Sequence, residues 1–364
     1  MRLKKYLITV LIFILGCMLL VAGCGKNDSK KEPVIKTITV TDCIGRSVEL
    51  IQPLERVVIL SNNVAEGMRI LRVQDKIIGV TESAQKNPYL GMQDKEIVGT
   101  MSQPSYEKIV ELRPQVVIAF GTAGAGQEVA EKLEAAEIKV VLLDLYKPET
   151  YDAELITLAK MFGKEKEADA FLKWKAEQIS ILDKAKELKS EQRVSVFSMH
   201  TSSFESGKWM LTGSAISVNQ AIEMAGGIST TRELKSGTAV SPEWVLQQNP
   251  GILVFTEDSD VIPNVGVKLG PKTNDLANAE KFKEEVIKNK VLSKTDAVQK
   301  DRIYMVPNEI LGRNKSYLGA LYLAKWFYPD QFKDLDPDKI LQEYFEKWLD
   351  VPFQGKWAYP PILK

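Results

Sequence analysis

Short apolar runs alternate with helical patterns along the first part of this chain. A continuous apolar run of about 4–8 residues is typical of a strand buried on both faces of a parallel sheet, whereas a three-and-four spacing indicates an amphipathic helix. Two alternating segments, at residues 37–40 and 47–50, first predict a hairpin. The pattern then predicts strands at 56–61, 77–80, 96–98, 116–120 and 139–143, with helices at 64–73 and 127–136. This alternation predicts an α/β lobe with a mostly parallel sheet.

The α/β pattern stops near residue 149 and starts again after residue 190. Residues 149–190 are rich in Ala, Leu, Lys and Glu and predict one long helix, which only Gly163 could interrupt. A helix of about 35 residues would be ~50 Å long, more than one lobe needs, so we expect it to bridge two lobes. For the second lobe we predict strands at 193–198, 252–254 and 303–306, a helix at 215–225 and a helical tail at 317–348.

One sequence motif, called the Ser-x-Glu phrase below, occurs once in each predicted lobe. Residues 105–118 align without a gap on residues 241–254, with matching Ser, Glu and Pro positions. Each copy predicts a short helix capped by serine, a proline stop and a buried strand, with Glu107 or Glu243 in the first helical turn. The simplest role of both glutamates is to stabilise the helix dipole. A single duplication is too little for a solenoid, so we interpret the copies as two related lobes.

The N-terminal segment has the pattern of an export signal. Arg2, Lys4 and Lys5 precede an apolar run, which ends in the sequence Val-Ala-Gly-Cys at 21–24. This pattern resembles a bacterial lipoprotein signal, so we expect cleavage before Cys24, lipidation of that cysteine (palmitate among the acyl groups) and anchoring at the extracytoplasmic face of the cell membrane. The alternative is an uncleaved transmembrane anchor. The predicted segments are a signal peptide at 1–23, a flexible leash at 24–36, an N-terminal lobe at 37–148, the bridging helix at 149–190, and a C-terminal lobe with its tail at 191–364.

Charge and cysteine content exclude several classes of function. The chain has 48 basic and 48 acidic residues, so it lacks the excess of positive charge that is typical of proteins that bind nucleic acid. If Cys17 is removed with the signal and Cys24 is lipidated, only Cys43 of the three cysteines remains, which excludes an internal disulfide. Cys43 has no histidine near it in sequence, so we interpret it as structural rather than nucleophilic.

Metal-site and enzyme signatures are missing as well. His200 is the only histidine, so the chain cannot assemble a multi-histidine metal site, and we predict no bare-metal site. The glycine-rich residues 121–126 follow a predicted strand but lack the Gly-Lys-Ser/Thr ending of a phosphate loop. We therefore predict no catalytic residues and no cofactor.

The predicted strand ends offer aromatic, amide and cationic side chains instead. Ligands of doubly wound folds meet the loops at the carboxyl ends of the strands. Aromatic rings beside Lys and Arg suit a bulky, oxygen-rich ligand such as a chelated metal, although each aromatic could equally be a core residue. The strand-end rule selects Asn62, Asn63, Tyr89, Met101, Thr122, His200, Phe204, Lys208, Trp209, Arg313 and Tyr317.

These features together resemble the substrate-binding lipoproteins of ABC importers for iron complexes, haem and cobalamin. The resemblance rests on Val-Ala-Gly-Cys at 21–24, the Asp-Cys-Ile-Gly-Arg-Ser-Val opening at 42–48, the strand at 56–61 with Glu66-Gly67, and both copies of the Ser-x-Glu phrase. It covers residues 37–330 and implies two α/β lobes joined by a rigid helix, with the ligand in the cleft and little hinge motion. It also implies that Glu107 and Glu243 dock into arginine pockets of a permease dimer that works with ATPase subunits. Cys43 departs from the family pattern, in which a small or apolar residue is common there.

We therefore expect a binding protein that captures an iron complex, such as a ferric siderophore, and delivers it to the permease. Arg313 and Lys208 would contact anionic oxygens, while Trp209, Tyr89 and Phe204 would pack on the organic shell. Cobalamin and haem are alternatives, with Met199 or His200 on the haem iron. A rival class is a membrane-tethered hydrolase with a glutamate base, which requires the repeated glutamates within about 10 Å of one another. A structural or adhesive surface protein is a further alternative.

Overall fold

The computed structural model describes residues 35–121, 126–211, 215–235, 237–257, 267–312 and 314–362. The described chain from Lys36 onward belongs to one compact unit. It opens with the predicted hairpin, in which β1 (Lys36–Thr41) pairs antiparallel with β2 (Ser47–Gln52). The Asp42 carboxylate closes the turn by accepting hydrogen bonds from the backbone N–H groups of Ile44 and Arg46, at 3.2 and 2.9 Å. None of the helices in the described ranges is long and apolar enough to cross a membrane.

The N-terminal lobe contains a five-stranded parallel sheet in the order β5-β4-β3-β6-β7. The strands and the helices between them are β3 (Val57–Ile59), α2 (Asn62–Ile70), β4 (Ile77–Val80), α3 (Glu82–Lys86), β5 (Glu96–Ile97), α4 (Tyr106–Leu112), β6 (Val116–Ala119), α5 (Gly126–Glu134) and β7 (Lys139–Leu142). Every residue of β3 and β6 is buried, as continuous apolar runs predict. Chain order reverses between β3 and β6, which makes the loops after these two strands the expected rim of a ligand crevice.

The C-terminal lobe repeats this arrangement with four parallel strands in the order β11-β10-β8-β9. Its elements are β8 (Ser195–His200), α9 (Thr201–Glu205), α10 (Ala215–Met224), β9 (Ile228–Ser229), α11 (Pro242–Gln248), β10 (Ile252–Glu257), α12 (Ala277–Lys288), α13 (Asp296–Gln299), β11 (Ile303–Pro307), α14 (Asn308–Leu311) and α15 (Ser316–Phe327). The spatial order β9-β8-β10-β11 matches β4-β3-β6-β7 of the first lobe, so the two repeated phrases form equivalent helix–strand units. The prediction of an α/β fold with two mostly parallel sheets is confirmed.

The bridging segment is helical and is interrupted at Gly163, the residue at which an interruption was expected. It consists of α6 (Pro148–Phe162), α7 (Glu165–Ser180) and the short α8 (Asp183–Lys186). Gly163 adopts a left-handed conformation with φ of 64°, which ends α6 in the way typical of a glycine just past a helix. Helices α6 and α7 pack against each other, so only α7, about 24 Å long, remains as the continuous bridge.

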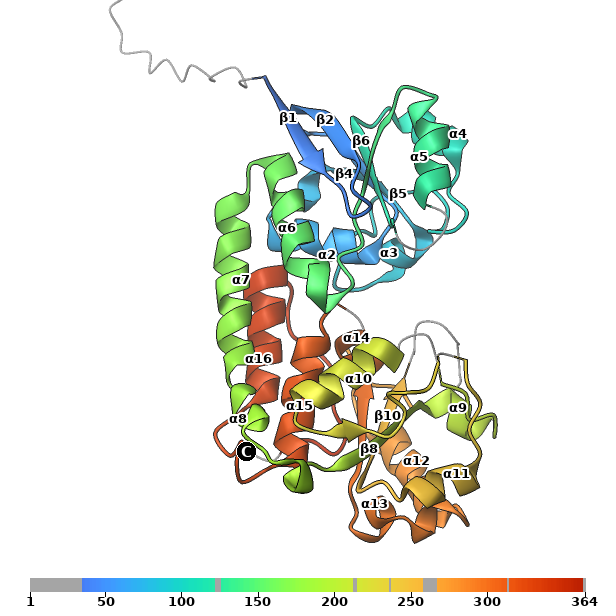
Figure 1. The fold of residues 1–364 in the computed structure, drawn as a ribbon. Helices are drawn as coiled ribbons and strands as arrows, with labels where there is room; N and C mark the ends of the chain where they lie inside the picture. Colours follow the sequence, from blue (N-terminus) through green and yellow to red (C-terminus); the bar gives the residue numbers. More distant parts are fainter. Residues whose placement is uncertain are drawn as a thin grey trace, which may run out of the picture. The chain divides into compact units, whose positions relative to one another are not determined.

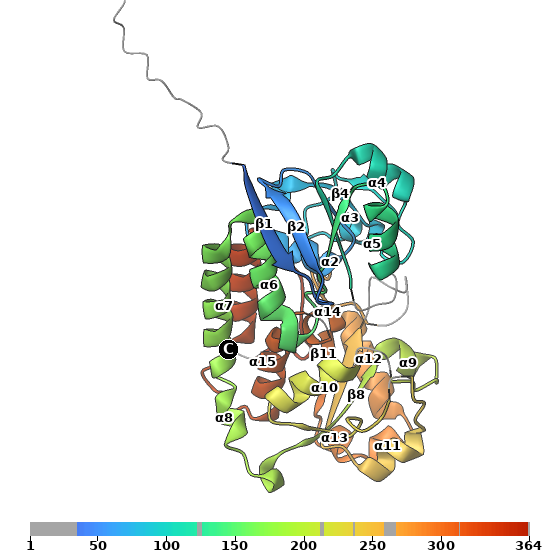
Figure 2. The same ribbon diagram turned by 45° about the horizontal axis from the view of Figure 1, so that its top comes forward.

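The helical tail forms a second connection between the lobes. It continues from α15 into α16 (Pro337–Glu343) and a π-helical turn, η4 (Tyr344–Leu349). Helix α16 lies beside α7 in both views (Figures 1 and 2), and η4 packs against α2 of the N-terminal lobe. Arg69 of α2 donates to the carbonyl oxygens of Leu349 and Asp350, at 2.8 and 3.3 Å. The tail predicted to belong to the C-terminal lobe is therefore shared by both lobes.

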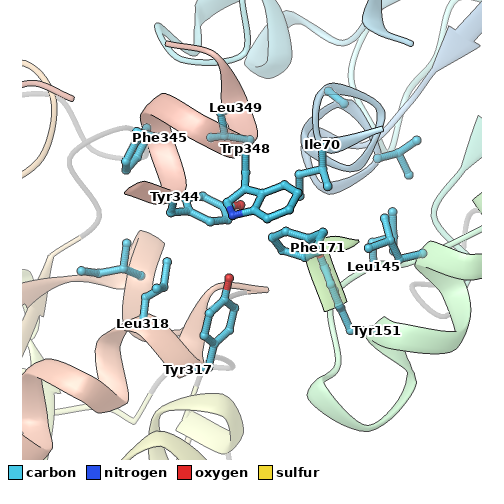
Figure 3. Close-up of a cluster of buried hydrophobic side chains, with 14 of the residues drawn as sticks. Ile70, Leu145, Tyr151, Phe171, Tyr317, Leu318, Tyr344, Phe345, Trp348 and Leu349 are labelled. Carbon is cyan, nitrogen blue, oxygen red and sulfur yellow. The ribbon is translucent and has the colours of Figure 1, made fainter. Parts of the chain in front are cut away.

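An aromatic cluster fills the space between α7, η4 and α15. Phe171 contacts Trp174, Tyr344 and Trp348, with ring centroids 5.8, 6.3 and 5.2 Å apart (Figure 3). Tyr317 of α15 lies below these rings in the same view. Apolar burial at this junction opposes separation of the lobes.

Candidate functional site: a pocket at the carboxyl ends of the strands

A pocket of about 770 Å³ lies where loops of the two lobes meet. Most of its lining follows the carboxyl ends of the N-terminal strands β3 to β7, as the position of the topological switch predicts. The C-terminal lobe contributes the segment that follows β11 and, from the loop before α12, Lys272. The described lining residues are Leu60, Ser61, Asn62, Asn63, Glu82, Ser83, Lys86, Asn87, Thr100, Met101, Phe120, Tyr146, Lys272, Asn308, Glu309 and Gly312.

Amide and hydroxyl groups dominate the wall formed by the N-terminal lobe. The Asn62 Oδ1 atom accepts a hydrogen bond from the Ser83 hydroxyl at 3.0 Å and from the Thr81 hydroxyl at 3.5 Å. Asn63 donates from Nδ2 to the Asp144 carbonyl oxygen at 3.1 Å. These contacts fix the rotamers of both asparagines before any ligand arrives, which lowers the entropic cost of binding.

Opposite charges compensate each other along the pocket lining. Lys86 pairs with Glu82 on α3, and Glu309 pairs with the buried Lys315 at 2.7 Å. Lys272 adds one further cation to the described lining. The described wall therefore has no large excess of either charge, and it suits a ligand whose own charges are small or shielded within a chelate.

Two aromatic rings, together with Leu60 and Met101, supply the apolar part of the wall. The rings of Phe120 and Tyr146 meet edge to face with centroids 6.4 Å apart. The Tyr146 hydroxyl donates to the Gly312 carbonyl oxygen at 3.2 Å, so this ring also connects the two lobes. Apolar rings combined with a few oriented polar groups are typical of sites for organic ligands.

The described residues contain no group of three or more His, Cys, Asp or Glu side chains that could hold a metal ion. Cys43 lies outside the pocket lining as described, with its Sγ 3.8 Å from Asp144 Oδ1. Burial, followed by the charge of Asp144, raises the pKa of this thiol to about 12. The thiol is therefore protonated at neutral pH, and this supports the structural interpretation of Cys43.

The strand-end rule selects part of this pocket correctly. Asn62, Asn63 and Met101 all line it. Tyr89 is buried beside it and donates its hydroxyl hydrogen to Glu309. Cys24, Thr122 and Arg313 lie outside the described residues, and Arg313 directly follows the lining residue Gly312 in sequence.

The candidates from the C-terminal lobe lie elsewhere. Trp209 and Phe204 belong to an apolar cluster of that lobe, with Phe204 against Phe282 at 5.2 Å between centroids. His200 and Tyr317 are buried, and Lys208 is exposed. None of these five is among the described lining residues of the pocket. Burial in a core explains the two aromatics of α9 and its loop, and a direct ligand contact from any of the five stays a prediction.

Several lining residues were missed although the signal for them existed. Phe120 and Tyr146 follow β6 and β7, and Asn308 and Glu309 follow β11, so the same strand-end rule applies to all four. Arg313 was predicted from this segment, whereas Asn308 and Glu309 were not. Lys272 follows no strand directly, and no local pattern marks it.

The repeated glutamates occupy matching, exposed positions in the two lobes. Glu107 lies in the first turn of α4 and Glu243 in the first turn of α11, and both are exposed. The equivalent residues Arg113 and Asn249 end these helices in left-handed conformations, with φ of 47° and 40°. Helix α4 packs in the N-terminal lobe against α5 and β4, whereas α11 packs against η3 (Leu292–Lys294) in the C-terminal lobe. Their location in separate lobes gives no support to a shared acid–base site.

Comparison with known proteins identifies the class of protein to which this fold belongs. The sequence profile of the periplasmic binding protein family matches residues 57–310, so the chain belongs to this family. Its members bind solutes and are not enzymes. The family resemblance inferred from the sequence is confirmed.

Individual relatives cover most of the chain at low identity. An uncharacterised ABC transporter substrate-binding lipoprotein of Bacillus subtilis, YvrC, is 25% identical over 88% of this chain and 97% of its own length. The molybdate-binding protein MolA of Haemophilus influenzae is 23% identical over 86% and 92%. A shorter match, 31% identical over 41% and 50%, is to the Fe(3+) dicitrate-binding periplasmic protein FecB of Escherichia coli.

A solved structure shows the same fold. The TroA-like periplasmic binding protein FepB of Veillonella parvula superposes with a TM-score of 0.74, covering 88% of this chain and 99% of that one at 22% identity.

Proposed function

We propose that this protein captures a ferric chelate, such as a ferric siderophore, outside the cytoplasm and delivers it to an ABC import permease. The observation that supports this proposal best is the pocket itself: about 770 Å³ at the strand ends, lined by amides, hydroxyls and two aromatic rings. Pockets of about 300–1,000 Å³ are typical for organic ligands of drug size. The lack of a carboxylate, cysteine and histidine cluster among the described residues favours a metal that arrives already chelated.

A bare oxyanion such as molybdate fits this pocket poorly. An ion of five heavy atoms would leave most of the volume unfilled, and the lining includes the carboxylates of Glu82 and Glu309. Burying an anion beside carboxylates is costly unless cations and N–H donors surround it. The similarity to MolA therefore supports membership of the same family and does not support molybdate as the ligand of this protein.

The anchor and the docking surface complete the proposal. Lipidation at Cys24 would hold the protein at the outer side of the membrane. Glu107 and Glu243, exposed on equivalent helices of the two lobes, would each contact one permease subunit. Arg313 follows the lining residue Gly312 in sequence and is the candidate partner for anionic ligand oxygens, with Lys208 as a second cation. The further candidates for ligand contacts are Trp209, Tyr89, Phe204, Tyr317 and His200.

Isothermal titration calorimetry against a panel of ligands tests the proposed function. The panel consists of ferrioxamine B as a ferric hydroxamate, ferric dicitrate, haem, cobalamin and molybdate. We expect a ferric chelate to bind most tightly, and Asn62→Ala and Phe120→Ala to weaken it at least about 10-fold through lost polar and ring contacts. The matched control Asn278→Ala, at an exposed position of α12, should leave the affinity unchanged. Tight molybdate binding with no binding of any chelate would overturn the proposal.

A further inference from the structure

A buried carboxylate on α2 joins three separate segments of the chain. Glu66 is 3% exposed. It accepts hydrogen bonds from Asn314 Nδ2 at 2.9 Å, from Lys315 Nζ at 2.7 Å and from the Tyr344 hydroxyl. Glu66 belongs to the N-terminal lobe, whereas its partners come from the loop before α15 and from η4.

Lys315 occupies the centre of this network and is 1% exposed. Its ammonium lies 2.7 Å from both Glu66 Oε2 and Glu309 Oε1, and 3.2 Å from Asn314 Oδ1. Burial acts to lower the pKa of Lys315, but the charges of Glu309 and Glu66 outweigh it and raise the pKa above its ordinary value. Lys315 is thus a cation held between two carboxylates.

Glu309 carries the network to the pocket wall. It lines the pocket and receives a hydrogen bond from the Tyr89 hydroxyl in addition to the contact with Lys315. Burial, followed by the charge of Glu309, raises the pKa of Tyr89 well above its ordinary value, so the phenol stays protonated and can donate. The other end of the network also reaches the pocket, because α2 begins at the lining residue Asn62, one turn before Glu66.

Stability alone does not explain two buried charges, Glu66 and Lys315, beside a third, Glu309, whose side chain is 20% exposed at the pocket wall. Apolar residues of similar volume usually replace a buried ion pair without loss of stability, whereas the best-attested role of such groups is to fix one relative arrangement of the elements they join. Here they join the first helix of one pocket wall to the residues of the opposite wall.

We propose that Glu66, Lys315 and Glu309 form an interlobe latch that sets the spacing between the two pocket walls. The three are positioning residues: Lys315 holds the carboxylate of α2 and the carboxylate of the C-terminal wall at one separation, and Tyr89 orients the second carboxylate. The latch deepens the proposed ligand-binding function, but it exists in the ligand-free protein and does not depend on which ligand is bound.

Hydrogen exchange of the full-length, ligand-free protein, followed by mass spectrometry, tests the latch. Lys315→Met leaves the buried carboxylate of Glu66 and the partly exposed carboxylate of Glu309 without their cation. We expect the opening constant of peptides from α2, α14 and η4 to rise about 100-fold or more. Peptides from strands β6 and β10, inside the two sheets, should change far less.

Two further variants separate a latch from a general loss of stability. The double variant Glu66→Gln/Lys315→Met removes one anion together with the cation. Its opening constant should therefore be at least about 10-fold lower than that of Lys315→Met alone. The control Lys283→Met removes a cation that pairs with Asp301 inside the C-terminal lobe, at 2.6 Å, and should leave α2 and η4 protected. The latch would be overturned if hydrogen exchange accelerated equally in the sheets and at the junction. It would also be overturned if the double variant recovered no protection against exchange. Because the assay uses no ligand, failure of the proposed transport function leaves this result intact.

Discussion

Replacement of Phe171 by alanine should cost this protein about 3–5 kcal/mol of unfolding free energy. Phe171 is fully buried on α7 and its ring meets three other aromatic rings, two of them on η4 (Figure 3). Truncation removes about 100 Å² of buried apolar surface, or ~2.5 kcal/mol at about 25 cal/mol per Å². A residual cavity of about 80 Å³ adds ~2 kcal/mol at about 24 cal/mol per Å³. The sum falls inside the range observed for buried Phe→Ala substitutions.

Urea unfolding followed by both near- and far-ultraviolet circular dichroism measures this loss. Two coincident transitions are required before a free energy is extracted, because a chain with two lobes can unfold in steps. Lys173→Ala is the matched control, since Lys173 is exposed on the same helix and should change stability by less than about 0.5 kcal/mol. A loss below about 1.5 kcal/mol for Phe171→Ala would show that the cluster relaxes around the gap, and would refute the interpretation of α7 and η4 as a tightly packed bridge.

Three further predictions address the helix break, the thiol and the docking surface. Gly163→Ala should lower the unfolding free energy by about 1–2 kcal/mol, because alanine is strained at φ of 64°, and Gly163→Asn should cost less in the same urea assay. The pKa of Cys43 is about 12 in the folded protein against an ordinary 9.0, so its contribution to stability is fully present below pH 9 and is lost as the pH rises toward 12. Cys43→Ala should therefore flatten the fall of stability across that range, and peptide mass spectrometry should show little iodoacetamide labelling of the native thiol at pH 8. Glu107→Arg combined with Glu243→Arg should abolish uptake of the proposed chelate into proteoliposomes that contain the permease, without changing the affinity of the protein for the chelate. Glu111→Arg, on an exposed face of α4, should leave uptake intact.

The strands and the duplication could be predicted from sequence because both depend on local patterns. Continuous apolar runs locate the starts of β3, β6 and β10 within one residue, and the Ser-x-Glu phrase identifies equivalent units in both lobes. The predicted helix at 149–190 breaks at Gly163, where the sequence allowed an interruption. Helical spacing of apolar residues continues on both sides of this glycine, so the pattern alone could not decide whether the helix ends there. A left-handed residue, rather than a change of pattern, separates α6 from α7.

The pocket could be predicted only in part because its walls come from distant segments. Asn62 and Asn63 follow a strand and were found, while Lys272 follows no strand and left no signal. Tyr89 stays a predicted ligand contact, and its hydrogen bond to Glu309, a residue 220 positions away in sequence, could not be predicted. Glu66 was noted only for its resemblance to a family motif, and nothing local shows that its partners are Lys315 and Tyr344. Long-range polar partners of this kind are fixed by the folded arrangement of the two lobes.

The crossing of the tail onto the first lobe has a consequence for biogenesis. The chain emerges from its amino end during synthesis, whereas η4, which packs against α2, lies within the final segment. Until Tyr344 and Leu349 have emerged, Glu66 lacks its phenol partner, and Arg69 has its Leu90 acceptor but lacks the carbonyl oxygen of Leu349. Completion of the binding site is thus tied to completion of the polypeptide, and a product truncated before residue 344 would lack a closed junction between its lobes.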